Sequence, residues 1–168
     1  MESGDVLAVL DGLEAGAIPV WLDGGWGIDA LIGEQTRPHA DLDIVVPQVD
    51  CDRARQALAA LGYEHDASIE PGLPARLVLR DESGREVDVH PIVRDDRGNG
   101  WQPLGPGAWG AYPADGLTGE GEVEGRRVRC LTPGLQLRHH LGYRLGDTDR
   151  HDLRLLAGHF GLALPPGV

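Results

Sequence analysis

Residues 39–46 read His-Ala-Asp-Leu-Asp-Ile-Val-Val, and the alternation in this segment decides the fold. Because successive side chains of a strand point to opposite faces, the pattern predicts a β-strand over residues 42–46. Asp41 and Asp43 then share one face, about 7 Å apart along the backbone, while the apolar residues face a core. Neighbouring carboxylates repel each other, so we expect a divalent cation to compensate them. Magnesium, which binds through carboxylates and substrate phosphates, fits such an Asp-x-Asp site.

A second acidic row follows in residues 85–92, which read Arg-Glu-Val-Asp-Val-His-Pro-Ile. In a strand, Glu86, Asp88 and His90 share one face. If this strand neighbours the first, the two lie about 4.8 Å apart and Asp88 can join the first pair of aspartates. Three carboxylates can hold two metal ions about 3.5–4 Å apart, which clamps the attacking and leaving oxygens of a phosphoryl transfer. The alternative is that both rows are solvated outer faces of edge strands.

A glycine turn lies before the first acidic row, in residues 21–30, which read Trp-Leu-Asp-Gly-Gly-Trp-Gly-Ile-Asp-Ala. Gly24 and Gly25 stand between an expected strand and an expected helix, where the backbone can approach a ligand and free N–H groups attract anions. This arrangement suits a triphosphate. Arg37 and His39 are expected to contact phosphate oxygens, and surface solvation of Arg37 is the alternative. The phosphate-loop and dinucleotide glycine motifs are both absent from the sequence.

The rest of the chain predicts an α/β (α+β) fold, a small mixed sheet flanked by helices with a helical C-terminal segment. Ser3 is expected to cap a first helix, and Thr132 followed by proline indicates the start of a later one. Residues 94–125, rich in Gly, Pro and Trp, are expected to form a long loop. Further strands are expected at residues 18–22, 76–79, 86–92 and 128–131, and further helices at residues 26–32, after Asp50 and around residues 153–160.

Length, charge and cysteine content bound the class of protein. The 168 residues suit a single domain over residues 1–168, with sheet and helices in 1–131 and a helical segment in 132–168. A formal net charge of -12 disfavours a nucleic-acid partner, and no apolar run approaches the roughly 20 residues of a membrane span. Cys51 and Cys130 lack metal-ligand spacing, so we expect reduced thiols and a cytoplasmic protein. A homodimer stays an open expectation.

The motifs resemble those of a known superfamily. A Gly-Gly turn, then Asp41-x-Asp43, then a third carboxylate on a later strand form the signature of the polymerase-β-like nucleotidyltransferases. Within them, residues 21–31 and 35–44 look like the lincosamide and aminoglycoside nucleotidyltransferases, and residues 87–92 and 129–156 are similar to that family too.

The resemblance implies roles for individual residues. It implies Gly24 and Gly25 as triphosphate contacts, Asp41 and Asp43 as metal ligands, and Asp88 as the third metal ligand and catalytic base. The sequence departs from the wider superfamily at Gly25, where serine is usual, so backbone N–H groups would contact the phosphate instead.

The resemblance also implies an activity. We expect a magnesium-dependent enzyme, with two Mg²⁺ ions, that transfers AMP from ATP or another NTP to a hydroxyl of a small molecule and releases pyrophosphate. The expected acceptor is a lincosamide- or aminoglycoside-type antibiotic, whose amine an acidic cleft would attract. The candidate acceptor contacts are Glu86, His90, Asp95 and Trp101, and Trp109 and Tyr112 are further aromatic candidates for stacking on sugar rings.

Three alternatives remain open at this point. One is a toxin-like nucleotidyltransferase acting on tRNA or protein, although the densest basic segment, residues 126–129, is short. Another is a nucleotide-binding module without turnover. The third is a zinc hydrolase, although adjacent histidines on a helix point about 100° apart. Its candidate ligands would be His139, His140, His151 and Asp152.

Overall fold

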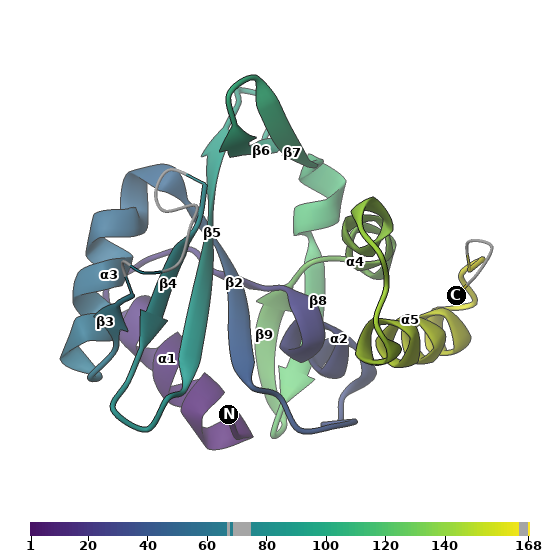
Figure 1. The fold of residues 1–168 in the computed structure, drawn as a ribbon, viewed down its shortest axis with the longest axis horizontal. Helices are drawn as coiled ribbons and strands as arrows, with labels where there is room; N and C mark the ends of the chain where they lie inside the picture. The colour runs from purple at the N-terminus through teal and green to yellow at the C-terminus, as the bar shows by residue number, and fades with distance from the viewer. Residues whose placement is uncertain (67, 69–74, 165–167) are drawn as a thin grey trace.

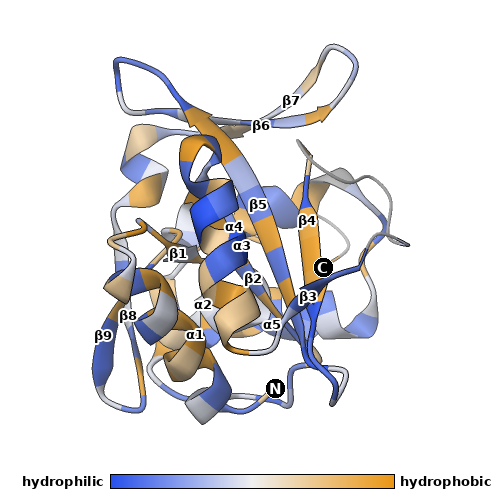
Figure 2. Cartoon of the chain, turned by 90° about the vertical axis from the view of Figure 1, so that its left-hand side faces the viewer, coloured by the Kyte–Doolittle hydropathy of each residue, from blue (hydrophilic) through white to orange (hydrophobic). Residues whose placement is uncertain are grey.

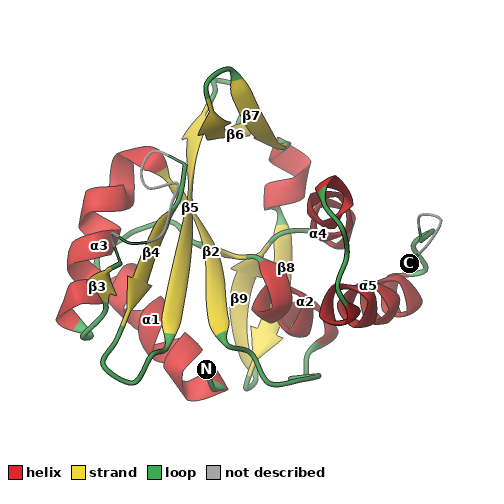
Figure 3. Ribbon diagram, viewed as in Figure 1, coloured by secondary structure: helices red, strands yellow, loops and turns green. Residues whose placement is uncertain are grey.

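The computed structural model describes residues 1–66, 68, 75–164 and 168 (Figure 1). It consists of a mixed sheet with helices packed around it, which Figure 3 shows by secondary structure. The helices are α1 (Ser3–Ala15), α2 (Gly24–Ile32), α3 (Cys51–Ala60), α4 (Pro133–His139) and α5 (Asp147–Phe160), with 3-10 turns η1 (Gln48–Asp50), η2 (Ala114–Leu117) and η3 (His140–Gly142). The strands are β1 (Trp21–Leu22), β2 (Asp41–Pro47), β3 (Glu64–His65), β4 (Leu77–Arg80), β5 (Glu86–Arg94), β6 (Gly100–Gly105), β7 (Ala108–Tyr112), β8 (Gly119–Val123) and β9 (Arg126–Cys130).

The sheet runs in the order β3-β4-β5-β2-β1-β9-β8. The two acidic strands β2 and β5 are parallel neighbours, and their register sets Asp43 directly opposite Asp88. A hairpin of β6 and β7 continues from the end of β5 and stands at the top of Figure 1. This architecture confirms the expected α/β class with a mixed sheet flanked by helices.

Alternation along the strands divides the apolar residues between two clusters, one on each face of the sheet. Leu42 and Ile44 pack with the buried faces of α1 and α3, while Val45 and Ile92 pack with Leu135 of α4. Figure 2 shows this alternation as orange and blue bands along β5. Because Asp43 and Val45 are two residues apart, Asp43 lies on the α4 side of the sheet.

The helix and the strand expected near the N-terminus are both present, but their boundaries differ from those predicted. The stripe of α1 is buried as predicted, but Glu2 rather than Ser3 is the N-cap, and a reciprocal pair of hydrogen bonds between Glu2 and Asp5 closes the first turn. Ser3 instead donates to Glu124 at 2.9 Å. The strand expected over residues 18–22 is reduced to β1. The buried stripe of α1 includes Val6, Val9, Leu10 and Leu13.

The prediction of a long loop over residues 94–125 is wrong. This segment contains all of β6, β7 and β8, and η2. The hairpin forms because β6 pairs with the end of β5, where Gly100 leaves room for the Ile92 side chain: a Cβ at residue 100 would lie 2.7 Å from Ile92 Cδ1. Local propensity disfavoured strands here, and long-range pairing overrides it.

The C-terminal segment is helical, as expected, and α4 and α5 lie together on the right of Figure 1. Both helices pack against α2. Because α2 starts at the glycine turn, this packing brings the C-terminal segment to the acidic strands. Across the part of the chain that the structure describes, none of the helices has the length and apolar character needed to cross a membrane.

Candidate active site

The glycine turn is the start of α2, and it lies directly against the acidic strand. Asp23 is the N-cap, and its carboxylate accepts a hydrogen bond from the Gly24 N–H at 2.8 Å. Gly24 has φ +55°, and a Cβ there would lie 2.2 Å from Asp43 Oδ2. Two features therefore require glycine at residue 24: the left-handed backbone conformation and the closeness of the Asp43 carboxylate. The sequence analysis did not predict Asp23 as the N-cap of this helix, although a short polar residue just before a helix is the usual signal for one.

Gly25 has a packing reason of its own. A Cβ at residue 25 would lie 2.4 Å from His39 Nδ1 and 2.5 Å from Arg37 Nη2. The side chains of Arg37 and His39 thus cover the first turn of α2, and only glycine admits them. The expected contact of Gly24 and Gly25 with a triphosphate stays a prediction, since packing alone accounts for a glycine at both positions.

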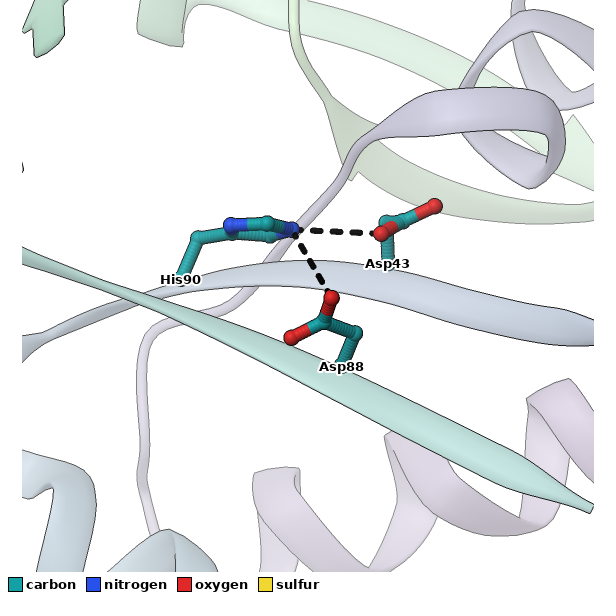
Figure 4. Close-up of side chains that lie close together, drawn as sticks. All are labelled: Asp43, Asp88 and His90. Atoms are coloured by element: carbon teal, nitrogen blue, oxygen red, sulfur yellow. Dashed lines mark hydrogen bonds and ion pairs between the residues drawn. The ribbon is translucent and has the colours of Figure 1, made fainter. Parts of the chain in front are cut away.

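An acidic cluster forms where β2 and β5 run side by side. Its members are Asp43, Asp88 and His90, whose ligand-type atoms all lie within 4.8 Å of one another (Figure 4). His90 Nε2 lies 3.1 Å from Asp43 Oδ1 and 3.9 Å from Asp88 Oδ2. The parallel register of the strands produces this convergence. It brings together residues 45 positions apart in the chain, as the two acidic rows predicted.

Asp41 lies at the start of β2, opposite Glu86. It lines the same cavity as Asp43, but among the described residues it does not belong to the group of closely spaced ligand atoms. Burial raises the pKa of Asp41, and the charges of Asp43 and Glu86 raise it further. Glu86 is held by Arg80, at 2.6 Å, on the strand next to it. A carboxylate with a raised pKa beside other carboxylates gains from a bound cation.

Asp88 has a cationic partner that the sequence did not indicate. Arg76, which precedes β4, pairs with the Asp88 carboxylate through Nε, at 3.2 Å, and through Nη2. Burial raises the pKa of Asp88, and although His90 and Arg76 lower it, the net shift is upward. A carboxylate with a raised pKa is a stronger proton acceptor, which suits the role of catalytic base.

Both residues expected to contact phosphate are engaged by carboxylates. Arg37 donates to Asp152 of α5 from Nε at 2.9 Å and from Nη2 at 2.6 Å. His39 is buried, and its Nε2 lies 2.5 Å from Asp29 Oδ2. The hydrogen bond to Asp152 raises the pKa of Arg37, so the guanidinium keeps its charge at the edge of the cavity. Their contact with phosphate stays a prediction.

A cavity of about 300 Å³ opens between the glycine turn, the acidic strand and the C-terminal segment. Asp149 of α5 and Tyr143, which precedes that helix, form one wall of the cavity. The Tyr143 hydroxyl donates a hydrogen bond to Asp149 Oδ1 at 2.9 Å. The sequence did not point to Tyr143 and Asp149 as site residues, although both lie within residues 129–156, which resemble the family, because they are far along the chain from the acidic strand. The lining residues are Asp23, Gly24, Gly25, Arg37, Asp41, Asp43, His139, His140, Tyr143, Asp149 and Asp152.

A larger cavity, about 590 Å³, lies at the β4–β5 turn. It includes Arg80 and Asp81 but none of the acidic cluster or the glycine turn. The volume of a cavity therefore does not identify the candidate active site. The site is identified by the carboxylates that converge at the smaller cavity.

The candidate acceptor contacts do not all gather at the cluster. His90 belongs to it, and Glu86 lies two residues before Asp88 on β5. Asp95 lies in the turn after β5 and Trp101 near the start of β6, where Trp101 Nε1 donates to Asp95 Oδ2 at 3.2 Å. Among the described residues that line the 300 Å³ cavity, neither of them is present.

The histidines of the zinc alternative take other roles. His139 lies 3.8 Å from Asp23 and packs edge-on against the ring of Tyr112, and His140 Nδ1 lies 2.8 Å from the Gln136 carbonyl. In the described part of the chain, neither histidine belongs to a group of three or more clustered metal-ligand side chains, and neither do His151 and Asp152.

The chain is similar in sequence to known nucleotidyltransferases. The model of a protein family described as aminoglycoside-2''-adenylyltransferase matches residues 5–156. A lincosamide resistance protein of Staphylococcus haemolyticus is 32% identical over 152 residues, which cover 90% of this chain and 92% of that protein. A 2''-aminoglycoside nucleotidyltransferase of Klebsiella pneumoniae is 30% identical over 114 residues, 67% of this chain and 58% of that protein.

Solved structures show the same fold. The lincosamide antibiotic adenylyltransferase LnuA, crystallised with lincomycin bound, superposes with a TM-score of 0.80 at 32% identity, covering 91% of this chain and 94% of that one. ANT(2'')-Ia in complex with adenylyl-2''-tobramycin superposes with a TM-score of 0.72 at 19% identity, covering 95% of this chain and 89% of that one. At that identity the second likeness concerns the fold alone.

Proposed function

The chain belongs to the aminoglycoside-2''-adenylyltransferase family, and on that premise we propose that it transfers AMP from ATP to a hydroxyl group of an antibiotic and releases pyrophosphate. One observation carries the proposal. Asp43 and Asp88 stand opposite each other on parallel strands, with the glycine turn packed against the Asp43 carboxylate. This is an arrangement for holding a triphosphate beside a proton acceptor.

The favoured acceptor is a lincosamide. The relative named as a lincosamide resistance protein matches this chain over nearly the whole length of both, whereas the aminoglycoside-modifying relative is matched over 58% of its length. An acidic cavity lined by Asp23, Asp41, Asp149 and Asp152 also suits a ligand that carries an amine. An aminoglycoside is the second acceptor to test.

The donor set of the cluster fits magnesium. Mg²⁺ prefers carboxylate oxygens and is commonly held by one or two carboxylates together with substrate phosphates. Asp43 and Asp88 supply such oxygens within 4.8 Å of each other, and Asp41, which lines the same cavity as Asp43, would be the third carboxylate to hold the metal. Bound magnesium would neutralise charge on the triphosphate and on the departing pyrophosphate.

Side chains and backbone groups of the protein would accept the proton and bind the phosphates. The acceptor hydroxyl oxygen attacks the α-phosphorus, the bond from that phosphorus to pyrophosphate breaks, and the hydroxyl proton passes to the Asp88 carboxylate. The Gly25 N–H at the start of α2 and the Arg37 guanidinium would bind phosphate oxygens, so most of the rate enhancement comes from positioning and electrostatics.

The proposed function is tested by measuring pyrophosphate release and the mass of the product formed with each acceptor. The protein would be incubated with ATP and Mg²⁺ plus lincomycin, tobramycin or total tRNA, and each reaction product weighed by mass spectrometry. We expect an acceptor heavier by one AMP with lincomycin, and loss of that product in Asp43→Asn and Asp88→Asn with the fold retained. AMP attached to tRNA, or turnover in either variant close to that of the unchanged protein, contradicts the proposal.

GTP, CTP and UTP belong in the same experiment, since nothing in the described cavity is specific to adenine. A donor other than ATP that is used faster would revise the nucleotide while leaving the reaction class in place.

A further inference from the structure

A buried chain of hydrogen bonds links the β6–β7 hairpin to the acidic cluster. Tyr112 on β7 donates from its hydroxyl to Gln102 Oε1 at 2.8 Å. Gln102 Nε2 lies 2.8 Å from the Ala75 carbonyl oxygen and 3.1 Å from His90 Nδ1. His90 Nε2 in turn lies 3.1 Å from Asp43 Oδ1. The Gln102 side chain thus contacts the one ring nitrogen of His90 that faces away from the cluster.

The neighbours of Gln102 determine which way round its amide lies. A carbonyl oxygen such as that of Ala75 can only accept, so the group facing it is the NH₂ end of the amide. The opposite end then accepts the hydrogen bond from the Tyr112 hydroxyl. Turning the amide over would set two carbonyl oxygens 2.8 Å apart in a buried site, which is costly.

This orientation assigns the proton on His90. Because the NH₂ group of Gln102 has no lone pair to offer, Nδ1 must be the acceptor and Nε2 must carry the hydrogen. The Nε2–H then has the Asp43 carboxylate, at 3.1 Å, as its nearer acceptor; Figure 4 draws dashed lines from this nitrogen to Asp43 and to the more distant Asp88. A nitrogen that carries a hydrogen and donates it has no lone pair for a metal ion.

We propose that Gln102 is a positioning residue that holds His90 as an Nε2–H donor to Asp43 and thereby excludes the imidazole from metal binding. Asp43 and Asp88 are then left as an oxygen-only pair, which suits Mg²⁺, whereas a free imidazole nitrogen would favour transition metals such as Zn²⁺. The inference rests on the proposed function only in naming Mg²⁺ as the metal. The assignment of the His90 proton stands on hydrogen bonds alone.

The test reads the His90 proton directly. ¹⁵N NMR of imidazole-labelled protein distinguishes a protonated ring nitrogen from a bare one, and the His90 signals are those missing from the spectrum of His90→Gln. At a pH where the ring is neutral, we expect His90 to carry its proton on Nε2 and to leave Nδ1 bare. In Gln102→Glu, whose carboxylate accepts from Nδ1, the proton should move to Nδ1 or occupy both nitrogens. In Tyr112→Phe, which keeps the bond to Ala75, the spectrum should stay as in the unchanged protein.

A second readout concerns metal choice and rate. Gln102→Met should lower kcat by up to about 10-fold, the lower end of the cost of losing a direct partner of a metal ligand, because Gln102 acts on Asp43 only through His90. The KM for ATP should change much less. Gln102→Glu should bind Zn²⁺ more tightly than the unchanged protein does in a titration without nucleotide. Thermal unfolding of each variant separates these effects from loss of the fold.

The outcomes separate this inference from the proposed function. A neutral His90 ring that carries its proton on Nδ1 in the unchanged protein, or one His90 signal pattern shared by the unchanged protein and Gln102→Glu, overturns the role of Gln102 even if AMP transfer is observed. The expected NMR pattern without turnover of any acceptor supports that role and counts against the proposed function alone.

Discussion

The backbone of Gly24 and the carboxylate of Asp43 occupy adjoining space: a Cβ on residue 24 would lie 2.2 Å from Asp43 Oδ2. The N-terminus of α2 and the acidic strand β2 are therefore one unit. A side chain at the glycine turn must either move the carboxylate or move the helix.

Gly24→Ala should abolish most activity with a moderate loss of stability. The φ of +55° costs an alanine about 1–2 kcal/mol, and displacement of Asp43 by about 1 Å can lower the rate 100-fold. Gly33→Ala is the matched control, because Gly33 also has positive φ, +89°, and a Cβ there meets nothing within 4 Å. Denaturant unfolding and kcat/KM should show similar destabilisation in both variants and lost activity in the first alone. Equal activity in the two variants would contradict the contact.

Asp152→Ala should destabilise the fold by roughly 2–3 kcal/mol, because it leaves the half-buried guanidinium of Arg37 without its carboxylate. The Arg37 and Asp152 side chains are 24% and 4% exposed. The control is Glu120→Ala, which removes a partner of Arg127 where both side chains are more than half exposed. That pair should contribute less than about 1 kcal/mol. Urea denaturation of both variants measures the difference, and comparable losses would show that the first pair is no stronger than a surface pair.

The Asp95 carboxylate should titrate well below its usual range. Hydrogen bonds from Asn99, and then from Trp101, lower its pKa to about 2 from 3.8. A lowered folded-state pKa means that Asp95 stabilises the β5–β6 turn above about pH 4, and that this contribution is lost as the pH falls towards 2. The indole N–H signal of Trp101, followed by NMR between pH 2 and 6, should shift with a midpoint below 3.8. In Asp95→Asn the shift should disappear, and a midpoint at or above 3.8 in the unchanged protein contradicts the hydrogen bonds.

Chelation should stop pyrophosphate release, and added Mg²⁺ should restore it. Asp43 and Asp88 provide the oxygen ligands, so Asp88→Asn should bind Mg²⁺ more weakly in calorimetric titrations with a non-hydrolysable ATP analogue present. Asp95→Asn, a carboxylate lost outside the described cavity, should bind it normally. Turnover that persists in excess chelator would remove the metal from the mechanism.

The faces of the acidic strands could be predicted from sequence because alternation is a local property. Asp43 and Asp88 each lie on the opposite face to their apolar neighbours, as the period of two requires. The same reasoning placed α1 and the C-terminal helices. It failed over residues 94–125, where Gly and Pro obscure the pattern and the strands form by pairing of β6 with β5 and β7, and of β8 with β9.

The sequence by itself determined the family, the kinds of chemical groups available and the face of the sheet on which they would lie. Only the tertiary structure decided which groups meet: Asp43 with Asp88 through strand register, Arg37 with Asp152 across 115 positions, and Gln102 with His90 through the hairpin. The physical reason is that side-chain direction follows from the local backbone repeat. The partner of a buried charge or amide depends instead on how distant segments pack, and no local pattern records that.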